Sequence, residues 1–127
     1  QAIEWYKNDL IIWSASMEKP IEVDKYCYSI DILPTVSNLL GLEYDSRLLI
    51  GQDILSDSEQ LVCFPDRSFI SGKCLYNASN GSITPLTDEE VTQEYIDAMS
   101  AIVYNKFMVS EMILDTNYYQ YLESNLK

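Results

Sequence analysis

Apolar and polar residues follow one another in blocks along this chain, and each block predicts a different element. Residues 9–15, DLIIWSA, form an uninterrupted apolar run that is rich in β-formers. Such a run is typical of a strand buried on both faces, as in a parallel sheet covered by helices. Residues 16–25 are polar and contain Pro20, which predicts a loop or an edge segment.

The stretch SIDILPTVSNLLGL, residues 29–42, predicts a helix over residues 31–40 with both ends marked. Asp31 is placed to cap it, and Pro34 then takes the third helical position, where its missing N–H costs no intrahelical bond. Gly41 is expected in the left-handed conformation, with Leu42 folding back onto the last turn. The apolar residues recur at helical spacing and predict a packing face made of Ile32, Leu33, Val36, Leu39 and Leu40.

After a turn-rich, acidic stretch over residues 43–60, the pattern changes to short β-like runs. The runs within residues 61–76, with turn signals at Pro65-Asp66 and Ser71-Gly72, predict a small antiparallel sheet of two or three strands. Residues 77–86 form a turn-rich link that contains Asn80-Gly81. That dipeptide is a strong hairpin signal.

A long helix is predicted from Thr87 to about Leu114. Thr87 and Glu90 have the spacing of a capping box, and Asp88 and Glu89 favour a helix N-terminus. The apolar residues that recur along it are Val91, Tyr95, Met99, Ile102, Val109 and Ile113. The stretch TNYYQYLESNLK then predicts a short aromatic helix at the end of the chain.

Together these elements predict a single α/β domain over residues 1–127. Residues 1–60 would end a main α/β sheet, and residues 61–127 would hold the small sheet and the C-terminal helices. No apolar run approaches the ~20 residues that a membrane-spanning helix needs, so we expect no membrane insertion by this segment. The chain begins with Gln1 rather than Met, and we expect a piece of a longer protein.

Charge and composition exclude several functions. The formal net charge is −12, from 8 basic and 20 acidic residues. The basic residues are scattered, which argues against nucleic-acid binding. The chain has no histidine, the commonest general base and zinc ligand. No phosphate-binding or nucleophile motif is present. We therefore predict no catalytic, metal-binding or cofactor-binding residues in this chain.

Two groups of polar residues are candidate ion-binding sites. Asp53, Asp57 and Glu59 could in principle hold Ca²⁺, but they lack the alternating ligands of an EF-hand, and we favour a solvated acidic loop. Asp66-Arg67 could form an anion-binding turn. We favour a simpler interpretation, in which Asp66 caps a turn and Arg67 pairs locally.

The cysteines and the long helix leave alternatives open. Cys27, Cys63 and Cys74 have neither disulfide-framework nor zinc spacing, and free buried thiols are favoured over a Cys63–Cys74 bridge.

The Met and Tyr residues of the long helix are interpreted as core, with a face that docks onto another domain as the alternative. These residues are Tyr95, Met99, Tyr104, Met108 and Met112.

Five stretches, in order, resemble one protein family. They are YKNDLIIWSAS, SIDILPTVSNLLGL, IGQDIL, FPDRSFISGKCLY and NKFMVSEMILDTNYY. Over most of residues 6–121 the chain resembles the C-terminal segment of the lipoteichoic acid synthase and phosphoglycerol transferase branch of the sulfatase superfamily, which has an alkaline phosphatase-like fold. The D-[IL]-x-P-T pattern of that superfamily corresponds here to Asp31, Ile32, Pro34 and Thr35.

The resemblance implies a parent enzyme whose chemistry lies outside this chain. In that family a threonine nucleophile acts on a divalent metal, usually Mn²⁺, and transfers or cleaves a phospho- or sulfo-ester in the cell envelope. The family's nucleophile and metal ligands precede the strand that DLIIWSA resembles, so none is carried over to a residue here. The implied partner is the remainder of the catalytic domain, on the extracytoplasmic side of a membrane-anchored parent. The isolated piece would be soluble and could self-associate through residues 9–15.

An alternative of a different class is a free-standing acidic module without enzymatic activity. It would bind a protein partner through the Tyr and Met face of the long helix.

Overall fold

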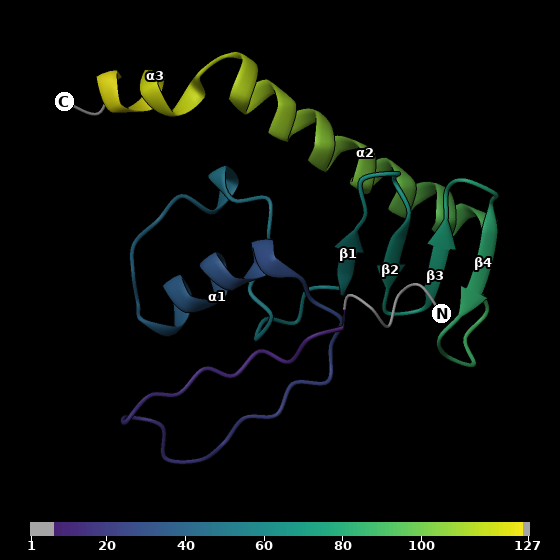
Figure 1. Cartoon of the computed structure of the whole chain (residues 1–127), viewed down its shortest axis with the longest axis horizontal. Helices are drawn as coiled ribbons and strands as arrows, with labels where there is room; N and C mark the ends of the chain where they lie inside the picture. The colour runs from purple at the N-terminus through teal and green to yellow at the C-terminus, as the bar shows by residue number, and fades with distance from the viewer. Residues whose placement is uncertain (1–6, 126–127) are drawn as a thin grey trace.

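The computed structural model describes residues 7–125 and shows a mixed α/β chain with one small sheet and three α-helices (Figure 1). The long helix α2 crosses one face of the sheet, and the shorter α1 lies beside the sheet rather than on it. The elements are the 3₁₀ turn η2 (Ser29–Asp31), α1 (Ile32–Leu39), the 3₁₀ turn η3 (Ser46–Leu48), β1 (Leu61–Cys63), β2 (Phe69–Ser71), β3 (Cys74–Asn77), β4 (Ser82–Pro85), α2 (Gln93–Asp115) and α3 (Tyr118–Asn125).

The sheet is an antiparallel meander in the order β1-β2-β3-β4. The prediction of two or three strands within residues 61–76 is confirmed for β1 to β3. The sheet gains β4 because the Asn80-Gly81 turn closes a further hairpin. Gly81 has a φ of 70°, and its N–H donates to the Asn77 carbonyl at 2.8 Å. β4 then pairs with β3 from Asn77↔Ser82 to Cys74↔Pro85.

The core lies between this sheet and the first half of α2. Alternate strand residues Leu61, Phe69 and Cys74 face the helix, and α2 contributes Ile96, Met99 and Val103. The predicted helix face was therefore partly wrong. Met99 is in the core, but Ile102 and Val109 are each 45% exposed. The helical spacing of the apolar residues was predicted correctly. Which of these residues face the core depends on the position of the sheet.

The predicted start of the long helix was also wrong. α2 begins after Thr92, whose hydroxyl accepts a hydrogen bond from the Tyr95 N–H at 3.2 Å. Leu86 still belongs to the sheet, because its N–H donates to the Lys73 carbonyl at 2.9 Å. The chain must pass from the edge strand β4 onto the face of the sheet before a helix can start. Glu89 therefore pairs with Lys73 at 2.7 Å rather than with a helix terminus.

The C-terminal end of α1 follows the sequence prediction, and the N-terminal end follows it in position only. Asp31 occupies the N-cap position, so Pro34 is the third helical residue, but the Asp31 side chain makes no capping hydrogen bond to α1. Gly41 has a φ of 65°, its N–H donates to the Asn38 carbonyl at 3.1 Å, and the Leu42 N–H reaches the Ser37 carbonyl at 2.9 Å. This pair of bonds is a Schellman end.

Residues 9–15 are not a strand, which corrects the prediction of a buried parallel strand. In the described structure they are extended, without regular secondary structure, and largely exposed. The run has β-forming residues, but the four strands of the described chain form a separate antiparallel sheet in which it takes no part. A strand needs a neighbour to satisfy its backbone groups. The alkaline phosphatase-like origin implied by the resemblance remains a prediction.

The C-terminal helices reach back to the segment before the sheet. The Lys106 ammonium donates to the Ile50 carbonyl at 2.5 Å, and the Tyr119 hydroxyl donates to the Leu48 carbonyl at 3.1 Å. The short aromatic helix predicted at the end of the chain is α3. Within residues 7–125, none of the helices combines the length and the apolar character needed to cross a bilayer.

Candidate interaction surface

The residues weighed as a cation site do not come together. The Asp53 carboxylate accepts hydrogen bonds from the Asn38 amide and from the Leu55 N–H, each at 2.9 Å. The Glu59 carboxylate instead accepts a hydrogen bond from the Tyr95 hydroxyl. Across the described part of the chain, no three His, Cys, Asp or Glu side chains are grouped so that they could hold a metal ion. The residues present therefore do not fit the metal that the resemblance implies for the parent.

Asp66 and Arg67 both make contacts within the chain. Asp66 caps the turn, as we favoured, because its carboxylate accepts hydrogen bonds from the Ser68 N–H at 3.0 Å and the Ser68 hydroxyl at 2.8 Å. Arg67 has a φ of 72°, and its guanidinium carbon lies 3.8 Å from the centre of the Phe107 ring. The expectation that Arg67 pairs locally was wrong, because its partner is an aromatic ring on α2, far along the sequence.

The three cysteines are free thiols, so the Cys63–Cys74 bridge is excluded. Cys74 is buried and Cys63 half-buried, as favoured, whereas Cys27 is exposed. Burial raises the pKa of the Cys63 thiol. Burial, followed by the hydrogen bond with Cys63, raises the pKa of the Tyr28 hydroxyl. Raised pKa values mean that the Cys63 thiol and the Tyr28 hydroxyl stay protonated at neutral pH, and a protonated thiol is a poor nucleophile.

Asp31 and Thr35 together fasten the segment after η3 to α1, and we call this pair the α1 clamp. The Asp31 carboxylate accepts hydrogen bonds from the Gln52 N–H at 2.9 Å and the Tyr28 N–H at 3.1 Å. The Thr35 hydroxyl donates to the Asp31 carbonyl at 2.6 Å and accepts from the Ile54 N–H at 3.0 Å. Asp31 is only 2% exposed, and burial raises the pKa of its carboxyl group.

The α1 clamp joins the stretch SIDILPT to the stretch IGQDIL. A Cβ on Gly51 would lie 2.0 Å from the Ile30 carbonyl oxygen, so only glycine allows the backbones to approach this closely. The two stretches are the two halves of one contact, and the contact fixes the orientation of α1.

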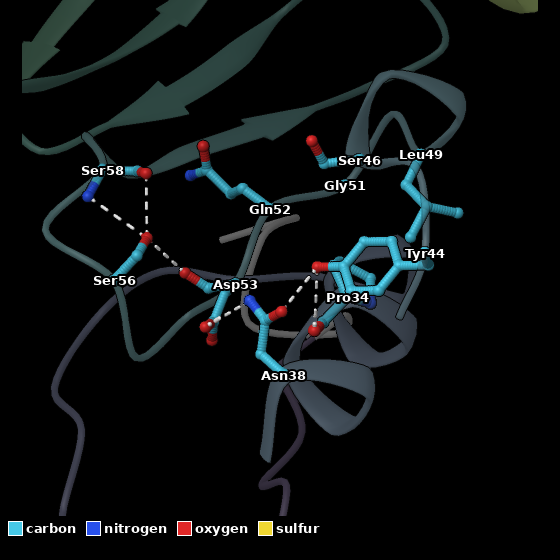
Figure 2. Close-up of a pocket in the computed structure, with 10 residues that line it drawn as sticks. All are labelled: Pro34, Asn38, Tyr44, Ser46, Leu49, Gly51, Gln52, Asp53, Ser56 and Ser58. Carbon is cyan, nitrogen blue, oxygen red and sulfur yellow. Dashed lines mark hydrogen bonds between the residues drawn. The ribbon is translucent and has the colours of Figure 1, made fainter. Parts of the chain in front are cut away.

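A polar hollow lies next to the α1 clamp (Figure 2), with a volume of about 270 Å³. Its lining side chains bond to one another. The Tyr44 hydroxyl donates to the Asn38 side-chain oxygen at 2.9 Å, and the hydroxyls of Ser56 and Ser58 are 2.8 Å apart. Because most of its polar side chains already have partners, the hollow is better explained as a structural network than as a ligand site.

The outer side of α1 is apolar and uncovered in the described structure. Thr35 and Ser37 are buried toward the α1 clamp, whereas Leu33 is 58% exposed and Leu40 is 64% exposed. The predicted apolar residues therefore share one face of this helix, but the face is exposed rather than packed in the described structure. We call the exposed residues the α1 outer face: Ile32, Leu33, Leu39, Leu40 and Leu42.

Residues 7–28, which we call the arm, form a second uncovered surface. The arm runs away from the sheet and back again to α1 (Figure 1). It turns where the Met17 N–H donates to the Ser14 carbonyl at 3.1 Å. On the outgoing limb Ile11 is 87% exposed and Trp13 is 82% exposed. The returning limb also exposes apolar side chains, at Ile21, Val23 and Tyr26.

The total exposed area agrees with this local picture. The chain has a solvent-accessible surface of 9923 Å². A compact monomeric protein of 14.6 kDa would expose about 6,900 Å², so the excess is about 3,000 Å². The chain is therefore less compact than a typical monomeric protein of its mass.

The chain is similar to lipoteichoic acid synthase 2 of Bacillus subtilis (strain 168), with 28% identity over 105 residues. The similarity covers 80% of this chain and 16% of that protein, so the chain spans about a sixth of the relative it matches. No family model matches the chain. No solved structure matches it either.

Proposed function

We propose that this chain is the non-catalytic C-terminal part of a cell-envelope enzyme that resembles lipoteichoic acid synthase. Its role is to dock onto, and complete, the catalytic portion of its parent. The parent transfers or hydrolyses a phospho- or sulfo-ester through a threonine nucleophile and a divalent metal such as Mn²⁺. The nucleophile and the metal ligands belong to that catalytic portion, on the extracytoplasmic side of a membrane-anchored protein.

The observation that carries this proposal is the uncovered apolar surface of the arm and the α1 outer face. A free-standing domain rarely leaves contiguous apolar patches of this size in water. The similarity to lipoteichoic acid synthase 2 over 80% of the chain supports the choice of parent. The absence of histidine from the sequence supports a part without catalytic groups.

In the docked arrangement, the arm and the α1 outer face both contact the catalytic portion. Residues 9–15 add to the edge of a sheet in the catalytic portion, which pairs their backbone groups and covers Ile11 and Trp13. The α1 outer face then packs on the same sheet, in the orientation that the α1 clamp sets. Burying apolar area of this kind stabilises by about 25 cal/mol per Å².

Co-purification with the catalytic portion tests the proposal. The catalytic portion, encoded upstream of Gln1, is expressed with the tagged chain as a separate polypeptide, and it should bind the chain and turn over a chromogenic phosphodiester with Mn²⁺. Trp13→Glu together with Leu40→Glu should abolish binding, because two charges would be desolvated in the contact. Thr84→Glu, a charge on the exposed edge strand β4, is the matched control and should leave binding intact.

Hydrogen exchange supplies a second readout. In the isolated chain the amides of residues 9–13 should exchange rapidly, and they should become protected in the complex. Failure of the catalytic portion to bind, or phosphodiesterase activity of the 127-residue chain alone, would overturn the proposal.

A second candidate is an acidic interaction module that binds a protein through the outer Tyr and Met residues of α2. Its support is that Tyr104 is 55% exposed and Met112 is 58% exposed. The coding sequence upstream of Gln1 discriminates between the two. A start codon immediately before Gln1 favours the module, whereas an upstream segment with several apolar spans and an Asp-His pair favours the enzyme part.

A further inference from the structure

The turn that joins β3 to the edge strand β4 contains an asparagine followed by a glycine (Figure 1). Asn80 and Gly81 are both exposed, and among the asparagines of the sequence only Asn80 precedes a glycine. The side-chain amide of an asparagine can react with the main-chain nitrogen of the next residue. Glycine hinders that nitrogen least, because it has no Cβ. The turn is therefore a candidate site of chemical modification.

The Asn80 side chain is turned toward the main chain that follows it. Its Oδ1 accepts a hydrogen bond from the Ser82 N–H at 2.9 Å, which curls the side chain across residue 81 as in an Asx turn. A donor on Oδ1 also stabilises the negative charge that develops on this oxygen when a nucleophile attacks Cγ. The carbonyl group of this side chain is thus already polarised for attack.

The nucleophile, by contrast, is restrained in the folded turn. The Gly81 N–H donates to the Asn77 carbonyl at 2.8 Å, and the nitrogen must lose this proton before it can attack. Gly81 has a φ of 70°, and nothing lies within 4 Å of its Cβ position. The turn can therefore open without displacing a packed side chain, and such local opening is what would free the nitrogen.

We propose that Asn80 is a site of spontaneous deamidation, and that the hydrogen bond from Gly81 to Asn77 limits its rate in the folded chain. When the turn opens, the Gly81 nitrogen gives up its proton and forms a bond to the Asn80 Cγ. The Cγ–Nδ2 bond then breaks, and Nδ2 leaves as ammonia with a proton equivalent to the one that the nitrogen lost. Residues 80 and 81 now share a succinimide ring.

Water hydrolyses this ring in either of two ways, with no change of oxidation state. Breaking the new bond to Cγ gives aspartate, whereas breaking the bond to the main-chain carbonyl carbon gives isoaspartate. Aspartate keeps the course of the main chain, and its carboxylate can still accept the hydrogen bond from the Ser82 N–H. The aspartate product should therefore preserve the β3–β4 hairpin.

Isoaspartate should loosen the hairpin, because it carries the main chain through the side chain and lengthens it by a methylene group. The Gly81 N–H would then no longer meet the Asn77 carbonyl while β4 keeps its register with β3. The same loop is bonded to the β1–β2 turn, since the Ala78 N–H donates to the Ser68 hydroxyl at 3.0 Å. The effect of isoaspartate should extend to that turn.

Asn77 is an internal control in the same hairpin. Its Oδ1 accepts a hydrogen bond from the Ser79 N–H at 2.9 Å, in the same way as the Asn80 Oδ1 accepts from Ser82. It precedes Ala78, whose Cβ hinders attack by the main-chain nitrogen. The two side chains share the Asx turn and differ in the residue that follows them.

Prolonged incubation of the 127-residue chain in mildly alkaline buffer tests the site. Peptide mapping with fragmentation should find the mass gain of deamidation at Asn80 and much less at Asn77, and an isoaspartate-specific carboxyl methyltransferase should label the same peptide. Asn80→Ser should prevent the acidic charge variants from accumulating, whereas Asn77→Ser, the matched control, should not. No deamidation at Asn80, or equal deamidation at Asn77, would overturn the assignment.

Urea tests the role of the hydrogen bond. Deamidation of Asn80 should be about tenfold faster or more in urea that unfolds the chain than in native buffer at the same pH, because the Gly81 N–H is then free. Equal rates in the two conditions would refute the protection by the turn. The reaction takes place within one chain, so its outcome is independent of docking onto a catalytic portion.

The stability of the aged chain tests the consequence. The fraction labelled by the methyltransferase should unfold at a lower urea concentration than the fresh chain, whereas Asn80→Asp should unfold at the same concentration as the fresh chain. An isoaspartate fraction as stable as the fresh chain would overturn the predicted loosening of the hairpin.

Discussion

The guanidinium of Arg67 stacks on the ring of Phe107, with 3.8 Å between its central carbon and the ring centre. This contact joins the β1–β2 turn to the part of α2 that follows the core residue Val103. Arg67 holds a φ of 72° there, a conformation that costs a non-glycine residue about 1 kcal/mol or more. The contact with Phe107 offsets part of that cost.

A double-mutant cycle should measure this contact. Arg67→Ala and Phe107→Leu should each destabilise the chain, with a coupling free energy of about 0.5–1 kcal/mol between them. Arg67→Gly should be more stable than Arg67→Ala by about 1 kcal/mol, because glycine accepts a positive φ. Urea denaturation followed by circular dichroism gives the free energies, and a coupling of zero would mean that the two side chains are merely neighbours.

Two glycines should respond differently to substitution. Gly51→Ala should cost about 3 kcal/mol, because the new Cβ would collide with the Ile30 backbone and separate the two halves of the α1 clamp. Gly41→Val should cost about 1–3 kcal/mol through its φ of 65° alone, since nothing lies within 4 Å of its Cβ position. Gly41→Asn is the control and should cost less, because asparagine tolerates this conformation. An unchanged denaturation midpoint for Gly51→Ala would show that the α1 clamp does not limit stability.

Asp31 should make a pH-dependent contribution of unusual sign. Burial raises the pKa of its carboxyl group above the ordinary value of 3.8, although the N–H groups of Gln52 and Tyr28 oppose the rise. The folded state therefore holds this proton more tightly than the unfolded state does. The stabilisation is fully present below the unfolded pKa and is lost as pH rises through the folded pKa. The free energy of unfolding of the wild type minus that of Asp31→Asn should therefore fall as the pH rises from below 3.8 through the raised folded pKa.

Asp45 supplies the control of opposite sign. Its hydrogen bond and ion pair with Arg47 lower the pKa of its carboxyl group to about 2. The stabilisation from this exposed pair is present above the unfolded pKa and is lost as pH falls toward about 2. The difference between wild type and Asp45→Asn should accordingly rise with pH over the acid range. The same slope for both variants would contradict the assignment for Asp31.

The Tyr95 hydroxyl should ionise only at high pH. Burial, and then the hydrogen bond to Glu59, raise the pKa of its hydroxyl to about 12. In a spectrophotometric titration, Tyr95→Phe should remove a component near that value, and Glu59→Gln should lower it only in part because burial is the larger cause. A titration unchanged by Tyr95→Phe would show that the hydroxyl is not held in this environment.

The sequence by itself determined the elements whose causes are local. The ends of α1 follow from Pro34 and Gly41, because a fixed φ and a tolerated positive φ act within a few residues. The β3–β4 hairpin follows from Asn80-Gly81 for the same reason. The approximate end of α2 could also be predicted.

Only the tertiary structure decided which faces are covered and by what. The start of α2 at Thr92 depends on the path from β4 onto the sheet, and the burial of Ile96 and Val103 depends on where the sheet lies. The partners of Arg67 and Asp31, Phe107 and Gln52, are distant in sequence, and no local pattern encodes such a pair. Residues 9–15 have the composition of a strand but stay extended and unpaired here, because a strand is completed by its neighbour and the described chain provides none.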